Sequence, residues 1–140
     1  MKTSAKVTAT AIVIGLAAMG LGQVIWPLAP GLPTPTLAQL PFLAFLDLAQ
    51  SLLFGLGVAL LIWGWPVFRG LSALTARLRA WCFASVVWLF ISWWPHIGFH
   101  RSMGEDLWSL IFIDYVFHFT IIIASLILMR AFLAWSRPPQ

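Results

Sequence analysis

The chain has 140 residues, of which 61% are hydrophobic and only 9% are charged, and its formal net charge is +4. A water-soluble domain of this length needs far more charged side chains to cover its surface, so the composition excludes that class. Apolar side chains over a whole outer surface suit a lipid bilayer instead. We therefore expect a multi-pass protein of the cell membrane, surrounded by lipid and without a nucleic-acid partner.

Four apolar stretches are long enough to cross a bilayer as helices, since a span needs roughly 20 mostly apolar residues. They are residues 7–28, 42–65, 78–94 and 107–129. Their apolar residues run continuously and do not alternate with polar ones, which excludes the strands of a membrane barrel. The sequence predicts an all-α, polytopic integral membrane protein: a four-transmembrane-helix bundle in which residues 1–140 form a single membrane domain.

Pro95 follows the third stretch directly. Proline has no backbone N–H to donate, so it ends or kinks a helix. The third helix is therefore predicted to end at Trp94, and the sequence leaves open whether residues 95–100 are helical.

The basic residues predict how the chain is oriented. Seven of the eight lysines and arginines lie before the first stretch, between the second and third, or after the fourth: Lys2, Lys6, Arg69, Arg77, Arg79, Arg130 and Arg137. Only Arg101 lies on the other side. Because positive loops are retained in the cytoplasm, both termini are predicted to be cytoplasmic. The first stretch also resembles a secretory signal, but no small-x-small cleavage site follows a short apolar core, so we expect a retained helix.

Polar residues within and beside the spans gather in the predicted outer half. They are Gln23, Asp47, Gln50, Asp114 and His118, together with His96 and His100 after the third stretch. At 1.5 Å per residue, Asp47 and Asp114 lie about 8 and 10 Å below the outer edge, and His118 about 16 Å. Ionisable groups in hydrocarbon are costly unless they are paired, so these side chains are predicted to meet inside the bundle.

The spacing of the histidines and carboxylates is compatible with a metal site. Asp114 and His118 are four residues apart, as are His96 and His100, so each pair lies on one helical face if its segment is helical. Imidazole nitrogen and carboxylate oxygen suit zinc, copper or iron. This hypothesis assigns His96, His100, Asp114, His118 and Asp47 as candidate metal ligands.

A second hypothesis treats the same polar cluster as structural. Polar contacts between membrane helices are common, and a chain with very short loops presents most of its surface to lipid. We expect on this basis a small accessory or structural subunit of a larger membrane assembly. Its partners would be other membrane subunits or further copies of the chain. Haem binding and proton conduction remain further alternatives, and the sequence reveals no substrate or catalytic residue.

Overall fold

The computed structural model describes residues 2–104 and 106–136. This part contains α1 (Thr3–Ile25), α2 (Leu40–Trp63), α3 (Trp65–Arg69), α4 (Ala76–Met103) and α5 (Leu107–Trp135). The described portions of α1, α2, α4 and α5 include four helical segments long and apolar enough to cross a membrane. The all-α fold and the four candidate spans are thus confirmed. The cytoplasmic placement of the termini stays a prediction, and Arg137, which contributed to it, lies outside the described residues.

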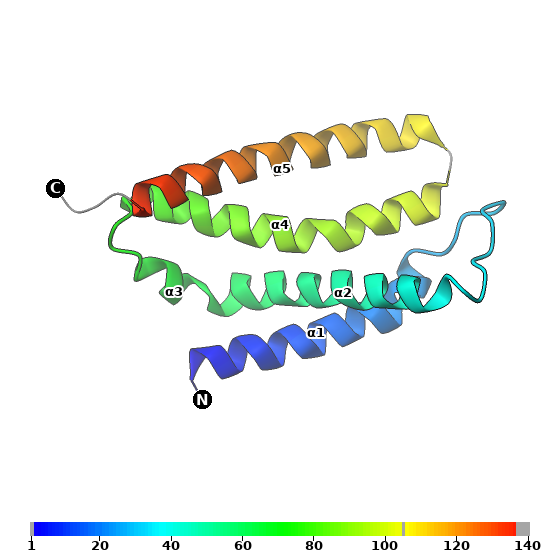
Figure 1. Ribbon diagram of the computed structural model, residues 1–140, viewed down its shortest axis with the longest axis horizontal. Helices are drawn as coiled ribbons and strands as arrows, with labels where there is room; N and C mark the ends of the chain where they lie inside the picture. Colours follow the sequence, from blue (N-terminus) through cyan, green and yellow to red (C-terminus); the bar gives the residue numbers. More distant parts are fainter. Residues whose placement is uncertain (1, 105, 137–140) are drawn as a thin grey trace.

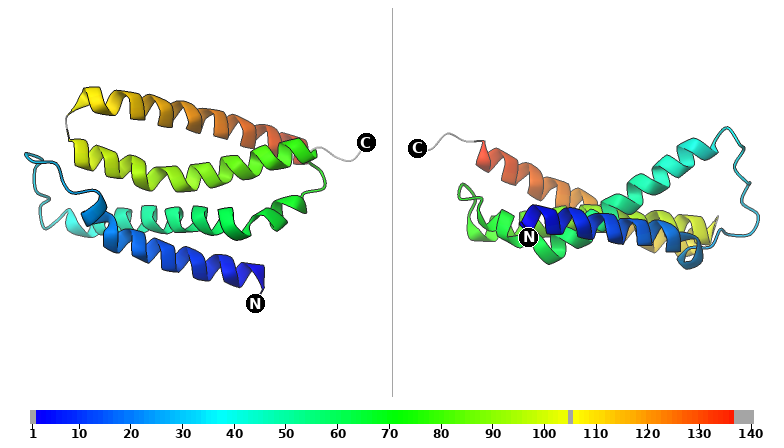
Figure 2. Two further views of the ribbon diagram at one scale, coloured as in Figure 1. Left: turned by 180° about the vertical axis from the view of Figure 1, so that it is seen from behind. Right: turned by 90° about the horizontal axis from the view of Figure 1, so that it is seen from below.

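The four long helices lie side by side in the order α1, α2, α4 and α5 (Figures 1 and 2). Helix α2 packs against α1 and α4, and α5 packs against α4. The start of α1 and the end of α5 are at the same end of the molecule, as an even number of spans requires (Figure 1). Helix α4, the third span, therefore lies between α2 and α5.

Small residues allow α1 and α2 to approach closely. A Cβ atom added at Gly55 would lie 2.2 Å from the carbonyl oxygen of Ala11, and one added at Gly15 would lie 3.0 Å from Cα of Leu52. Ala59, one turn after Gly55, is fully buried. Backbone contact of this kind supplies the dispersion attraction that holds helices together in lipid.

A second close approach joins α2 to α4. A Cβ atom at Gly57 would lie 2.7 Å from Cγ1 of Ile91 and 2.9 Å from its backbone nitrogen. Ile91 is the residue whose carbonyl would accept a hydrogen bond from position 95 in an uninterrupted helix. The two helices are thus in contact one turn before Pro95.

The prediction that the third helix ends at Trp94 is wrong, because α4 continues through Pro95 to Met103. Proline inside a helix removes one hydrogen bond and bends the axis, but packing against neighbouring helices makes this tolerable in membrane proteins. The path of α4 bends accordingly (Figure 1). Residues 95–100 are therefore helical.

The bounds of the other helices also differ from the prediction. Helix α1 covers Thr3–Ile25 instead of residues 7–28. Helix α2 begins at Leu40 because its first turn accepts Pro41, where no backbone donor is needed, and it ends before Gly64. Helix α5 continues from the predicted end at residue 129 to Trp135.

The contact between α1 and α2 predicts that Gly55→Ala destabilises the protein. Its new methyl group would meet backbone at 2.2 Å, so the helices must separate, at a cost of about 1–3 kcal/mol. Gly20→Ala is the matched control, because its Cβ atom meets nothing within 4 Å and alanine favours the helix. Thermal unfolding in detergent measures both variants, and equal stability of the two would contradict the packing described here.

Candidate metal centre

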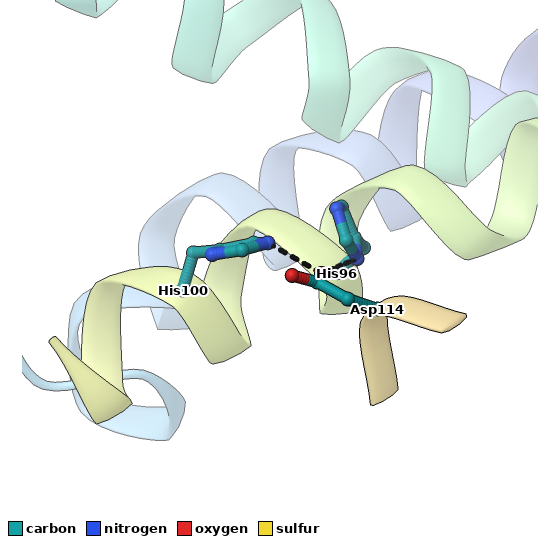
Figure 3. A group of neighbouring side chains, drawn as sticks. All are labelled: His96, His100 and Asp114. Carbon is teal, nitrogen blue, oxygen red and sulfur yellow. Dashed lines mark hydrogen bonds and ion pairs between the residues drawn. The ribbon is translucent and has the colours of Figure 1, made fainter. Parts of the chain in front are cut away.

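His96, His100 and Asp114 bring three candidate ligand atoms together between α4 and α5 (Figure 3). The two histidines are one turn apart on α4, and Asp114 faces them from α5. Nε2 of His100 donates a hydrogen bond to Oδ1 of Asp114 at 2.8 Å. Nδ1 of His96 lies 3.8 Å from the same oxygen. All three ligand atoms lie within 4.8 Å of one another.

The imidazole of His96 is buried and fixed in its orientation. Its side chain is 9% exposed, and its ring stacks on Phe117 with the centroids 3.6 Å apart and the planes 9° from parallel. Its Nδ1 atom has no hydrogen-bond partner among the described residues. A buried polar atom without a partner costs free energy comparable to a lost hydrogen bond. This nitrogen faces a carboxylate oxygen across a gap too long for a hydrogen bond.

His118 lies beside this group but bonds to backbone. Its Nδ1 atom donates to the carbonyl oxygen of Asp114 at 2.7 Å, and its ring meets that of His96 edge to face at 5.3 Å. Because a carbonyl only accepts hydrogen bonds, Nδ1 carries the proton and neutral His118 keeps its lone pair on Nε2. A hydrogen bond of this kind fixes the orientation of the imidazole ring. His118 nevertheless lies outside the three-residue group.

Contacts from α1 and the loop after it hold the segment of α4 that follows Pro95. Arg101 donates a hydrogen bond to Oε1 of Gln23, and its carbonyl oxygen accepts one from the backbone nitrogen of Ala29 at 3.0 Å. Trp26 packs on Gly98, where a Cβ atom would lie 2.5 Å from the indole ring. Gly98 lies two residues from both His96 and His100, so these contacts hold the helix face opposite the histidines.

Asp47 and Gln50 both lie on α2 and are not part of the ligand group on α4 and α5. Nε2 of Gln50 donates to Oδ1 of Asp47 at 2.9 Å within α2. Among the residues that the structure describes, Asp47 is outside the ligand group of α4 and α5. The sequence placed Gln23, Asp47 and Gln50 in one cluster with Asp114 and His118. In the structure, Gln23 accepts a hydrogen bond from Arg101, and Asp47 accepts one from Gln50.

The three grouped side chains offer two imidazole nitrogens and one carboxylate oxygen. Ligands of a tetrahedral zinc ion are about 3.3 Å apart, given metal–ligand distances of about 2.0–2.1 Å. The His96–Asp114 gap is therefore slightly wide and the His100–Asp114 hydrogen bond slightly short. The two histidine ligand atoms lie within 4.8 Å of each other, so an ion among the three groups would replace the hydrogen bond and draw the imidazoles closer together.

Neither the pair His96 and His100 nor the pair His96 and His118 is placed to ligate one haem iron from both sides. The His96 and His100 rings have centroids 4.6 Å apart, and His96 and His118 are 5.3 Å apart, with both pairs edge to face. Two imidazoles that ligate one haem iron lie on opposite faces of the porphyrin. These rings touch each other instead, so no porphyrin fits between them.

No model of a known protein family, no curated protein and no solved structure matches this chain. Its function must therefore be argued from the site itself, because a helical membrane fold alone supports many functions.

Proposed function

We propose that this protein binds a divalent transition-metal ion through His96, His100 and Asp114. The unpartnered Nδ1 atom of His96 carries this proposal. It is buried, it is held rigidly by Phe117, and it faces a carboxylate oxygen 3.8 Å away that already accepts a hydrogen bond from His100. A cation between these atoms would satisfy the imidazole lone pair and the carboxylate charge together.

The donor set narrows the choice of ion. Imidazole and carboxylate suit zinc, copper and iron, whereas calcium and magnesium prefer sites made of oxygen. Three protein ligands leave at least one coordination position open, which distinguishes reactive or transport sites from closed structural ones. His100 and Asp114 have side chains 42% and 33% exposed, so the ion would be reachable from outside the helix pair.

The proposal predicts that purified protein holds about one zinc, copper or iron ion per chain. Asp114→Asn removes the charge and His96→Phe keeps a flat ring against Phe117, so each variant should lose at least tenfold in affinity. Asp47→Asn is the matched control, because it changes an aspartate of another span that lies outside the ligand group. Elemental analysis and titration with Co²⁺, followed by its visible absorption, measure the binding.

Two results would overturn the metal proposal. One is the absence of a stoichiometric ion from protein purified without chelator and also after incubation with each of the three metals. The other is equal loss of metal in the Asp47→Asn control and the two ligand variants, since this would show that binding is not specific to His96, His100 and Asp114.

A second candidate function is that of a subunit in a larger membrane assembly. Helix α5 packs mainly against α4, and its other faces leave Phe112, Tyr115, Phe119 and Ile122 exposed. Asp114 and His100 are also partly uncovered within candidate spans, where contact with lipid is costly. A neighbouring chain over α5 would remove these groups from lipid. This role is compatible with metal binding.

The assembly proposal predicts that cross-linkable residues on α5 capture a protein neighbour in native membranes. A photoreactive amino acid at Tyr115 should yield a discrete protein adduct, while the same amino acid at Leu61 on α2, which is also exposed, serves as the control. Adducts with lipid alone at both positions, together with a stable monomer after mild extraction, would exclude this role.

A further inference from the structure

A groove between α4 and α5 lies at the end of the molecule opposite the candidate metal centre. It encloses about 520 Å³ and is lined by Arg77 and Trp81 of α4 and by Ile123, Ile127 and Arg130 of α5. Thr75, which caps α4, forms part of its rim. The groove has a polar mouth, formed by the two arginines and the indole of Trp81, and an apolar floor, formed by the two isoleucines.

The two arginines of the mouth have no side-chain partner in the part of the chain that the structure describes. Among residues 2–104 and 106–136, neither Arg77 nor Arg130 has a hydrogen-bonded or ion-paired side chain. Arg79 differs, because its guanidinium donates to the carbonyl oxygen of Arg69 at 2.6 Å. Two unpaired guanidinium groups at the mouth of one groove attract an anion, and their planar donors match the oxygens of a phosphate.

An adjoining cavity extends the apolar part of the groove. It encloses about 420 Å³ and shares Thr75, Leu78 and Arg130 with the first. Its other walls are Leu126, Met129, Leu133 and Ala134, all from α5. Ile123, Leu126 and Ile127 continue from Arg130 toward the middle of α5, where they fit the acyl part of a lipid whose phosphate lies at the arginines.

The position of the mouth agrees with this ligand. Arg77 is in the first turn of α4, and Arg130 precedes the end of α5 at Trp135 by five residues, or about 8 Å. Arginines and tryptophans at span ends lie at the level of lipid headgroups. Basic pockets between membrane helices at this level bind anionic lipids.

We propose that the groove binds one anionic phospholipid, with its phosphate between Arg77 and Arg130 and its acyl part along Ile123, Leu126 and Ile127. The charge of the mouth selects an anionic headgroup over a zwitterionic one. The apolar floor distinguishes a lipid from a free phosphate ion, which would gain nothing from Ile123, Ile127 or Leu126. This site is independent of the metal proposal.

Native mass spectrometry of delipidated protein tests the lipid site, with dioleoyl phosphatidylglycerol and dioleoyl phosphatidylcholine as probes. We expect one phosphatidylglycerol to bind, with phosphatidylcholine weaker by on the order of tenfold. The double variant Arg77→Gln and Arg130→Gln should lose this preference. The double variant Lys2→Gln and Arg69→Gln is the matched control, because it removes two exposed charges from the same end and should keep the preference.

A third variant tests the apolar floor of the groove without changing the charge of its mouth. Ile127→Trp fills the apolar floor and leaves both arginines, so it should also weaken phosphatidylglycerol binding. Equal binding of the two lipids by the unaltered protein would overturn the proposal. It would also be overturned by equal loss in both charge variants, or by full displacement of the lipid with millimolar inorganic phosphate.

Discussion

Helix α4 continues past Pro95, and the candidate metal centre depends on that continuity. If the helix ended at Trp94, His96 and His100 would belong to a loop and need not point the same way. The helical path places them one turn apart and turns both toward α5 (Figure 3). Proline costs this segment a backbone hydrogen bond, so packing must hold it in place. Trp26, Gln23 and Ala29 provide that support from the opposite side.

The distribution of polar groups gives the α4–α5 pair two chemically different ends. Imidazoles and a carboxylate lie between these helices toward one end, and two arginines without partners among the described residues lie toward the other. The imidazoles and the carboxylate offer a lone pair and a negative charge to a cation, and the arginines offer positive charge to an anion. Membrane proteins rarely keep such groups in or near hydrocarbon without a use, because desolvation is costly. A cation at one end and an anionic headgroup at the other fit this rule.

The sequence predicts the helical fold well because composition and length dominate that question. Four apolar stretches of the necessary length leave helices as the only arrangement that satisfies their backbone groups. Helix ends are less predictable, since they depend on neighbours. Pro95 signals an end when read alone, and only the contact of Trp26 with Gly98 and the Arg101 hydrogen bonds show how α4 is held beyond it.

The candidate site is predictable in part for a related reason. The i, i+4 spacing identifies His96 and His100 as a pair once the segment is helical, and Asp114 lies at a matching depth. Which helices are neighbours cannot be read from spacing. The side-by-side order puts α4 beside α5, so Asp114 meets His100, while Asp47 bonds to Gln50 within α2. Nothing in the sequence marks Phe117 as the residue that stacks on His96, because apolar residues occur throughout a span.

X-ray absorption spectroscopy at the edge of the bound metal tests the central claim most directly, because it reports the atoms around the ion. The geometry proposed here predicts a first shell of nitrogen and oxygen at about 2.0–2.2 Å, with the outer-shell scattering of two imidazole rings. A spectrum that lacks imidazole scattering, or that shows sulfur from Cys82, the one cysteine of the chain, would contradict it.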